Sequence, residues 1–231
     1  MRRREIVHVT AARYIIKSGM DMRQGRRYIL FLLQMTALLF ATCGLTTERE
    51  QKILDYYSDN SRNRYADLLV EVERYTTTAG AQYHQKFYKH LIGIAGDLVE
   101  KKKLVVEKAS IGFYYDKKSG DRNKLYLGAD LASPKGDFAQ PYEAVAVSLI
   151  RKDIRNIIET VNSCRSIFDE KDVVGMVIGW WWTATGARER VSIWVLKEDL
   201  MKFEDGMITF DELLLRSTFT NTIGRVIKLP L

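Results

Sequence analysis

Two stretches of the chain alternate apolar residues with small or polar ones at a period of two, the spacing of side chains on the two faces of a β-strand. They cover residues 109–131 and 173–196, and each contains a polar turn with a glycine near its middle. Apolar runs on either side of a short turn predict β-hairpins. Because both faces of these strands carry apolar or small residues, we expect helices to pack on both faces of the sheet.

Apolar residues at helical spacing flank and separate the hairpins. A period of 3.6 residues runs through 65–75, 83–98 and 142–161, and short helices are predicted at 198–206 and 209–217. A loop is expected over residues 133–141, followed by a helix that Pro141 opens, and a last strand over residues 220–231. We therefore predict an α+β fold, an antiparallel sheet of about five strands built from two hairpins and covered by helices on both faces.

The helix at 142–161 is expected on one face of this sheet and the N-terminal helical pair on the other. Four glycines in the hairpins would let a helix backbone come close to the strands. These are Gly112, Gly128, Gly175 and Gly179.

A separate signal near the start of the chain is an uncharged apolar run from Tyr28 to Leu45. A positive segment with Arg23, Arg26 and Arg27 precedes it, and the small-residue segment "ATCG" lies at its end. This order is typical of a secretory signal peptide. A retained signal anchor, an ordinary cleaved signal and a buried core helix are the alternatives, since the run is only marginally long enough to span a bilayer.

A cysteine directly after small residues at the end of an apolar run resembles the lipobox of bacterial lipoproteins, in particular the looser spirochaete type. Phe40 and Thr42 stand where that motif usually has leucine and a small residue. The resemblance implies that Cys43 is acylated, for example with palmitate, and becomes the mature N-terminus. It further implies a cell-envelope location, anchored to the membrane and facing the periplasm. It covers residues 22–44 only.

These signals divide the chain into four parts. Residues 1–21 are predicted to be an upstream extension, 22–42 a signal peptide, 43–63 the lipidated cysteine with a polar tether, and 64–231 a single α+β domain. Residues 1–42 carry a net charge of +6 out of the formal +7 of the chain. Because the remainder is nearly neutral, no nucleic-acid partner is expected.

No motif for catalysis or metal binding is recognisable. The sequence has no glycine-rich phosphate loop, no Gly-x-Ser-x-Gly elbow and no Cys-x-x-Cys pair. His84 and His90 are six positions apart, which places them about 240° apart around a helix and prevents a shared metal. We therefore predict no catalytic residue, no metal and no cofactor. A hydrolase-like envelope enzyme with an unrecognised site is the alternative.

Aromatic residues in the hairpins form the candidate ligand-binding set, at alternate positions that they share with glycines. The set consists of Tyr114, Tyr126, Trp181 and Trp194. Rings on such a face would line a cleft for a lipid, an apolar ligand or a partner protein. Trp180 and Trp182 are expected on the opposite face, in the core, and a triplet that only fills the core is the alternative. The predicted function is a membrane-tethered binding or structural module for a protein or an apolar or lipid ligand.

Overall fold

A computed structural model describes residues 64–117 and 120–231. The acylation of Cys43, the signal peptide and the tether fall outside these described residues. Within the described ranges, no helix combines the length and the apolar character that crossing a membrane would require.

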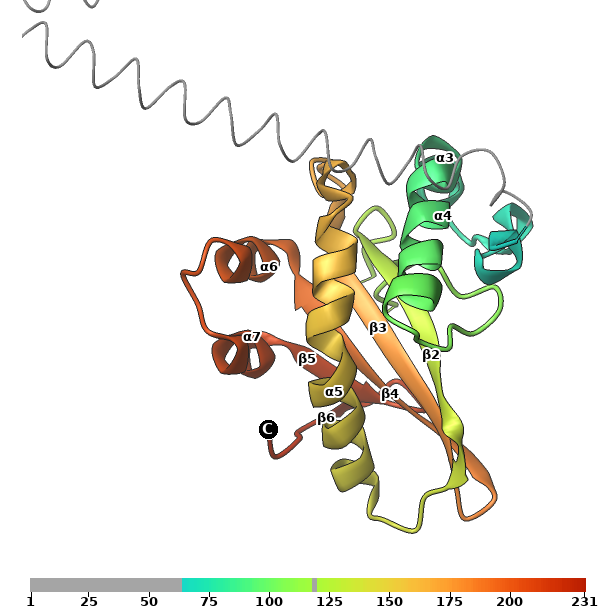
Figure 1. The fold of residues 1–231 in the computed structure, drawn as a ribbon. Helices are drawn as coiled ribbons and strands as arrows, with labels where there is room; N and C mark the ends of the chain where they lie inside the picture. Colours follow the sequence, from blue (N-terminus) through green and yellow to red (C-terminus); the bar gives the residue numbers. More distant parts are fainter. Residues whose placement is uncertain (1–63, 118–119) are drawn as a thin grey trace, which may run out of the picture. The chain divides into compact units, whose positions relative to one another are not determined.

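The strands form one six-stranded sheet in the order β1-β2-β3-β4-β5-β6. All neighbours are antiparallel except β2 and β3, which are parallel and joined by the long helix α5 (Figure 1). The strands are β1 (Gly112–Tyr115), β2 (Leu125–Asp137), β3 (Val173–Ala184), β4 (Ala187–Leu196), β5 (Thr218–Asn221) and β6 (Val226–Ile227). The α+β class is confirmed. The two stretches predicted as hairpins contain the antiparallel pairs β1–β2 and β3–β4, but the sheet is not built from these two hairpins alone, because β5 and β6 extend it beyond β4. The described sheet has one strand more than the expected five, and it contains a parallel pair.

The α-helices of the described chain are α3 (Thr78–Lys86), α4 (Tyr88–Gly96), α5 (Tyr142–Asn162), α6 (Lys197–Glu204) and α7 (Phe210–Arg216). Short 3₁₀ or π turns are η1 (Ala66–Leu68), η2 (Val72–Arg74), η3 (Asp97–Lys101) and η4 (Arg165–Ile167). As predicted, α5 begins directly after Pro141. The helices predicted at 198–206 and 209–217 are also present, as α6 and α7.

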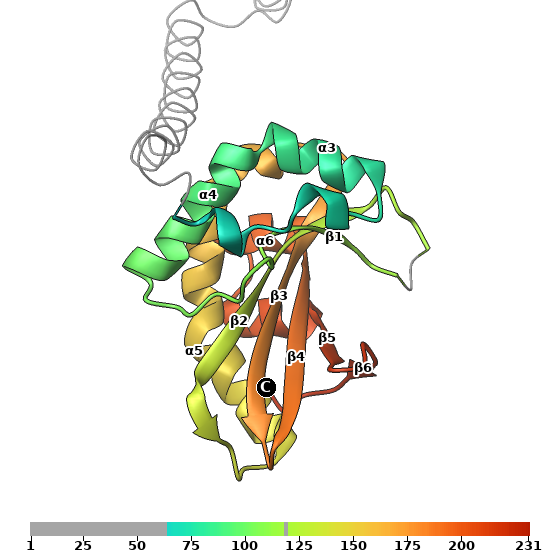
Figure 2. The ribbon, with the colours of Figure 1, turned by 90° about the vertical axis from the view of Figure 1, so that its right-hand side faces the viewer.

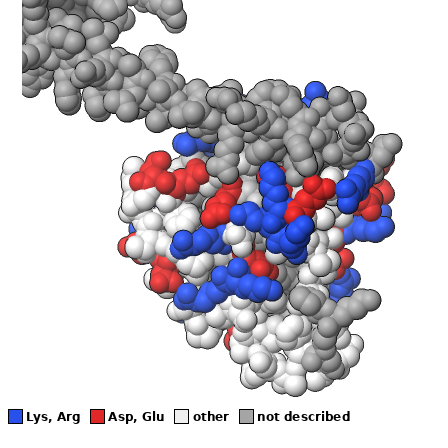
Figure 3. All heavy atoms as spheres, in the orientation of Figure 1, with Lys and Arg blue, Asp and Glu red and all other residues white. Residues whose placement is uncertain are grey.

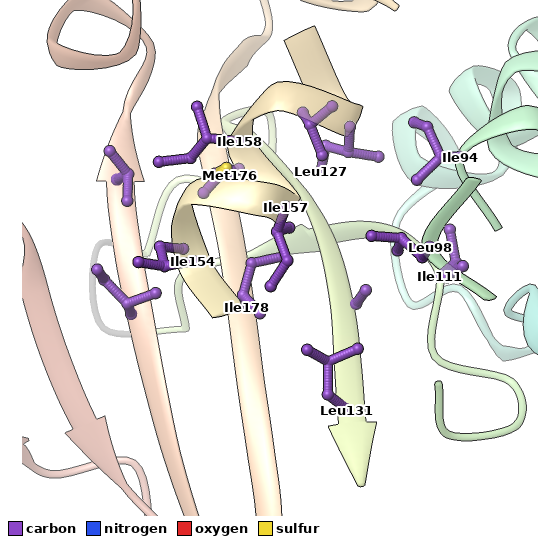
Figure 4. Close-up of a cluster of buried hydrophobic side chains, with 14 of the residues drawn as sticks. Ile94, Leu98, Ile111, Leu127, Leu131, Ile154, Ile157, Ile158, Met176 and Ile178 are labelled. Atoms are coloured by element: carbon purple, nitrogen blue, oxygen red, sulfur yellow. The ribbon is translucent and has the colours of Figure 1, made fainter. Parts of the chain in front are cut away.

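The core lies between the sheet and the helical layer. Figure 4 shows Ile154 and Ile157 of α5 over Ile178 of β3, with Ile94 and Leu98 on the neighbouring N-terminal helices. The outward side of α5 carries exposed Arg151, Lys152 and Arg155, and Figure 3 shows basic and acidic side chains interspersed on this side of the domain. The alternation of buried and charged residues along α5 fixes which side packs on the sheet.

The expectation that helices cover both faces is wrong. The N-terminal helices lie beside α5 on the same face, where Lys102 contacts Asn156 and Glu159 of α5. Across the described residues, no helix covers the central strands β3 and β4 on the opposite face, which Figure 2 turns toward the viewer. The described helices therefore leave one face of the sheet open.

The segment predicted as a helix over 65–75 instead forms the two short turns η1 and η2. The Val70 N–H donates to the Ile111 carbonyl at 2.9 Å, and Leu69 forms a parallel bridge with Ile111. The Tyr75 hydroxyl then accepts the Phe113 N–H at 3.2 Å. This segment follows the outer edge of β1 because its backbone bonds to residues 109–111, just before that strand, in addition to closing the short turns η1 and η2.

Two further boundaries differ from the expectation. Residues 133–137, expected in a loop, continue β2, and Asp137 pairs with Thr183 after an irregularity in register. The expected last strand over 220–231 is replaced by β5 and β6, which pair with each other around a turn at Gly224, where φ is +73°. After that turn, Ile227, Leu229 and Leu231 pack against the hydrophobic core.

Candidate functional site

The open face of the sheet carries a groove of about 550 Å³. This volume lies within the range of about 300–1,000 Å³ that small-molecule sites usually have. Residues from β1, β2, β3, β4 and the β5–β6 hairpin line it. The lining consists of Tyr114, Tyr115, Asp116, Lys117, Tyr126, Ala129, Asp130, Val177, Arg190, Trp194, Thr218, Thr220, Thr222, Ile223, Gly224 and Val226. Most of the lining residues are thus on strands, which hold side chains in place more firmly than loops do.

Glycines of β3 make the floor of this face. A Cβ on Gly175 would lie 3.0 Å from a ring carbon of Tyr126, and a Cβ on Gly179 would lie 2.1 Å from Asp130 Oδ1 and 2.7 Å from Arg190 Nε. Side chains therefore lie flat on the strand where a helix was expected to approach. The aromatic and charged groups of the groove take the space that these glycines leave.

Tyr126 and Trp194 form an aromatic corner in the groove. Their ring centroids are 5.0 Å apart with an interplanar angle of 86°, an edge-to-face arrangement. The indole Nε1 of Trp194 donates to Thr220 Oγ1 at 3.1 Å, which fixes the ring. Burial, followed by the nearby carboxylates of Asp116 and Glu198, raises the pKa of Tyr126. Both rings are partly exposed, so an apolar surface of fixed geometry faces the groove.

Tyr114 extends this apolar surface. Its ring lies over Gly128, where a Cβ would come within 2.6 Å of Tyr114 Cδ2 and 2.7 Å of Val177 Cγ1. Its hydroxyl donates to the Ser110 carbonyl at 2.6 Å. Burial, and after it the charge of Asp130, raises the pKa of the Tyr114 hydroxyl, which therefore stays protonated at neutral pH. Tyr114 therefore contributes an uncharged aromatic ring to the lining of the groove.

A charged cluster lies beside the aromatic surface. Asp130 Oδ1 accepts from Arg190 Nη2 at 2.6 Å, and Asp130 Oδ2 accepts from Trp181 Nε1 at 3.2 Å. The guanidinium carbons of Arg188 and Arg190 lie 4.4 and 5.4 Å from the centre of the Trp181 ring. The Asp130 and Arg190 side chains are only 22% and 27% exposed, so each depends on the other for its charge to be tolerated there.

The structure brings the four predicted aromatic residues to one face. Tyr114, Tyr126 and Trp194 line the groove, whereas Trp181 lies next to the charged cluster and is not part of the lining. Trp180 and Trp182 are 1% and 4% exposed on the core side, as expected from the alternation.

The sequence reasoning missed Asp130 and Arg190 as members of the groove. Both stand an even number of positions from a predicted ring, Asp130 four after Tyr126 and Arg190 four before Trp194. Residues at even spacing on a strand share a face. This signal would have placed them at the site.

The two histidines belong to the helical layer. His84 Nδ1 lies 3.0 Å from the Tyr75 hydroxyl, and His90 Nε2 lies 3.3 Å from Ser166 Oγ. The described lining of the groove includes no histidine, cysteine or serine. Nor do residues 64–117 and 120–231 bring three His, Cys, Asp or Glu side chains together in a way that would suit a metal ion.

Comparison with known proteins gives no identification: no protein-family model matches the chain, and neither curated proteins nor solved structures give a significant match.

Proposed function

We propose that residues 64–231 form a binding module, held at the cell-envelope membrane through acylated Cys43, that takes an apolar or lipid ligand on its open sheet face. The observation that carries this proposal is the groove itself. It places Tyr114, Tyr126 and Trp194 around a space of about 550 Å³ on a face that the described helices leave uncovered. A concave site with aromatic walls and a few polar groups is the usual form of a small-molecule site.

The rim of the groove supports an apolar ligand. Ile223 and Val226, on the β5–β6 hairpin, are 70% and 61% exposed and belong to the lining. Large apolar side chains next to an aromatic cleft extend the apolar surface beyond its walls. A ligand that covers them would remove this surface from water, which contributes about 25 cal/mol per Å².

The polar groups of the groove favour binding over catalysis. A hydrolase needs a nucleophile and a base within reach of each other. In the described lining, the carboxylate of Asp130 is already held by Arg190 and Trp181. A hydrolase-like activity would have to use a threonine or tyrosine hydroxyl of the lining without a histidine beside it.

The membrane anchor is a separate part of the proposal and rests on the lipobox resemblance around Cys43. Each buried CH₂ of an acyl chain contributes about 0.8 kcal/mol, and two or more chains give stable attachment. Cys43→Ser should abolish lipid labelling and processing while the domain keeps its melting temperature. An intact mass that still includes the residues before Cys43 would contradict the anchor.

The groove is tested by the binding of a neutral apolar dye to the purified protein. Trp194→Ala should weaken the dye roughly ten-fold or more, because it removes a large aromatic wall. Tyr88→Ala is the matched control, since Tyr88 is a half-buried ring on α4, in the helical layer. If both variants bind the dye as the parent does, the groove is not the ligand site.

A further inference from the structure

The charged cluster indicates which end group a ligand of the groove carries. Resting on the proposed function, we propose that the ligand is an amphiphile with a single carboxylate, whose head pairs with Arg190 and whose chain lies on the aromatic surface of Tyr126 and Trp194. Fatty acids have this chemistry.

The hydrogen bonds of the cluster leave unused donors on Arg190. A guanidinium has five N–H groups, and one of them, on Nη2, donates to Asp130. Arg190 Nε has no hydrogen-bond partner among the described residues but is buried, so the donors that a ligand can reach are the N–H groups on the exposed side of the guanidinium. Both oxygens of Asp130 already accept a bond, one from Arg190 and one from Trp181. The cluster therefore offers donors to a ligand rather than acceptors.

A carboxylate suits these donors best. Arginine and carboxylate form two parallel hydrogen bonds in a planar fork, which are stronger than bonds between neutral groups. The guanidinium is held in place, because its Nε and Nη2 lie close to Gly179 and Nη2 pairs with Asp130. With 27% of its side chain exposed, Arg190 remains accessible from the groove. A fixed guanidinium at a partly buried site discriminates between head groups more strongly than a surface lysine would.

The opposite part of the groove has Asp116 and Lys117 in its lining, so it has a charge of each sign. The carboxylates of Asp116 and Glu198 lie near Tyr126, where they help to raise its pKa. On β2, Tyr126 and Asp130 are four residues apart, roughly 13 Å of extended strand. A ligand with its only charge at Arg190 and an apolar chain toward Tyr126 needs no charged partner in that part of the groove.

The test compares three probes of equal chain length, decanoate, decanol and decylamine, by calorimetry at neutral pH and below micelle formation. We expect decanoate to bind at least roughly ten-fold more tightly than decanol, as a charge-assisted pair predicts. Equal binding of decanoate and decanol would overturn the carboxylate assignment but leave the apolar groove in place. Tighter binding of decylamine would also overturn it.

Variants of the cluster complete the experiment. The double variant Asp130→Asn/Arg190→Gln removes both charges, so neither is left buried and unpaired. It should lower decanoate affinity much more than decanol affinity, so that the two probes bind about equally, and its melting temperature shows whether it is folded. If it unfolds, Arg190→Lys keeps the charge but loses the fork, and should still reduce the preference for decanoate. An unchanged preference in a folded variant would overturn the role of Arg190. If no probe binds and Trp194→Ala has no effect on the dye, the proposed function itself fails.

Discussion

The tryptophan triplet of β3 provides a strong test of the one-sided sheet, because adjacent residues have opposite surroundings. Trp180 is 1% exposed in the core, whereas Trp181 is half-buried beside Arg188, Arg190 and Asp130. Trp180→Ala should destabilise the domain by about 4 kcal/mol, the usual range for a buried Trp being about 3–5 kcal/mol.

Trp181→Ala should cost about half as much. It removes one hydrogen bond to a carboxylate, worth about 1.5 kcal/mol or slightly more, and cation–π contacts worth about 0.5–1 kcal/mol. These terms sum to about 2 kcal/mol. The loss of unfolding free energy in Trp181→Ala is mainly electrostatic, so it should become smaller as salt is added. The loss in Trp180→Ala comes from burial and should not depend on salt in this way.

Urea unfolding measures both effects. With a slope of about 2 kcal/mol per M, the midpoint should fall by about 2 M for Trp180→Ala and about 1 M for Trp181→Ala. Trp182→Ala repeats the core measurement at a second position that is 4% exposed. Equal shifts for Trp180→Ala and Trp181→Ala, with the same salt dependence, would refute the assignment of the two residues to different environments.

Three further predictions concern stability. Gly175→Ala would place a Cβ 2.1 Å from the backbone oxygen of Val195, so we expect a loss of about 1–3 kcal/mol in thermal melts; an unchanged midpoint would contradict this close approach. Burial raises the pKa of Asp153, so its negative charge disfavours the folded state once the pH passes that pKa. Asp153→Asn should therefore raise the melting temperature at pH 7. This gain should vanish below pH 3.8, the ordinary pKa of the side chain. Burial lowers the pKa of His84, whose ring nitrogen Nδ1 lies in hydrogen-bond contact with Tyr75. The unfolded state therefore binds the proton more readily, and the stability of the domain should fall as the pH drops below 6.5. His84→Gln should remove this contribution to the pH dependence.

The hairpins could be predicted from sequence because their alternation is local. Trp180, Trp181 and Trp182 alternate in the structure as they do in the pattern, so the faces were assigned correctly. What fills each face could not be predicted in the same way. A glycine at 179 is equally compatible with an approaching helix and with an arginine laid across the strand, and only the tertiary structure distinguishes the two.

The parallel pair β2–β3 was missed although a signal existed. A long helix between two strands, here Tyr142–Asn162, gives the chain enough length to return to the same end of the sheet. In contrast, the turns over 65–75 had no local signal. The apolar spacing there is helical, but the bond from Val70 to Ile111 and the contact of Tyr75 with Phe113 override it. Such long-range backbone bonds are invisible in a single sequence.

The Tyr75 hydroxyl at the outer side of β1 has a consequence for self-association. A sheet grows by adding strands to edges whose N–H and C=O groups are unpaired. At β1 the Phe113 N–H is taken by Tyr75 and the Ile111 carbonyl by Val70, so an incoming chain would find these groups already bonded. Tyr75→Phe keeps the ring but exposes the Phe113 N–H. The variant should therefore form strand-paired aggregates on storage at high concentration more readily than the parent, starting from the β1 edge.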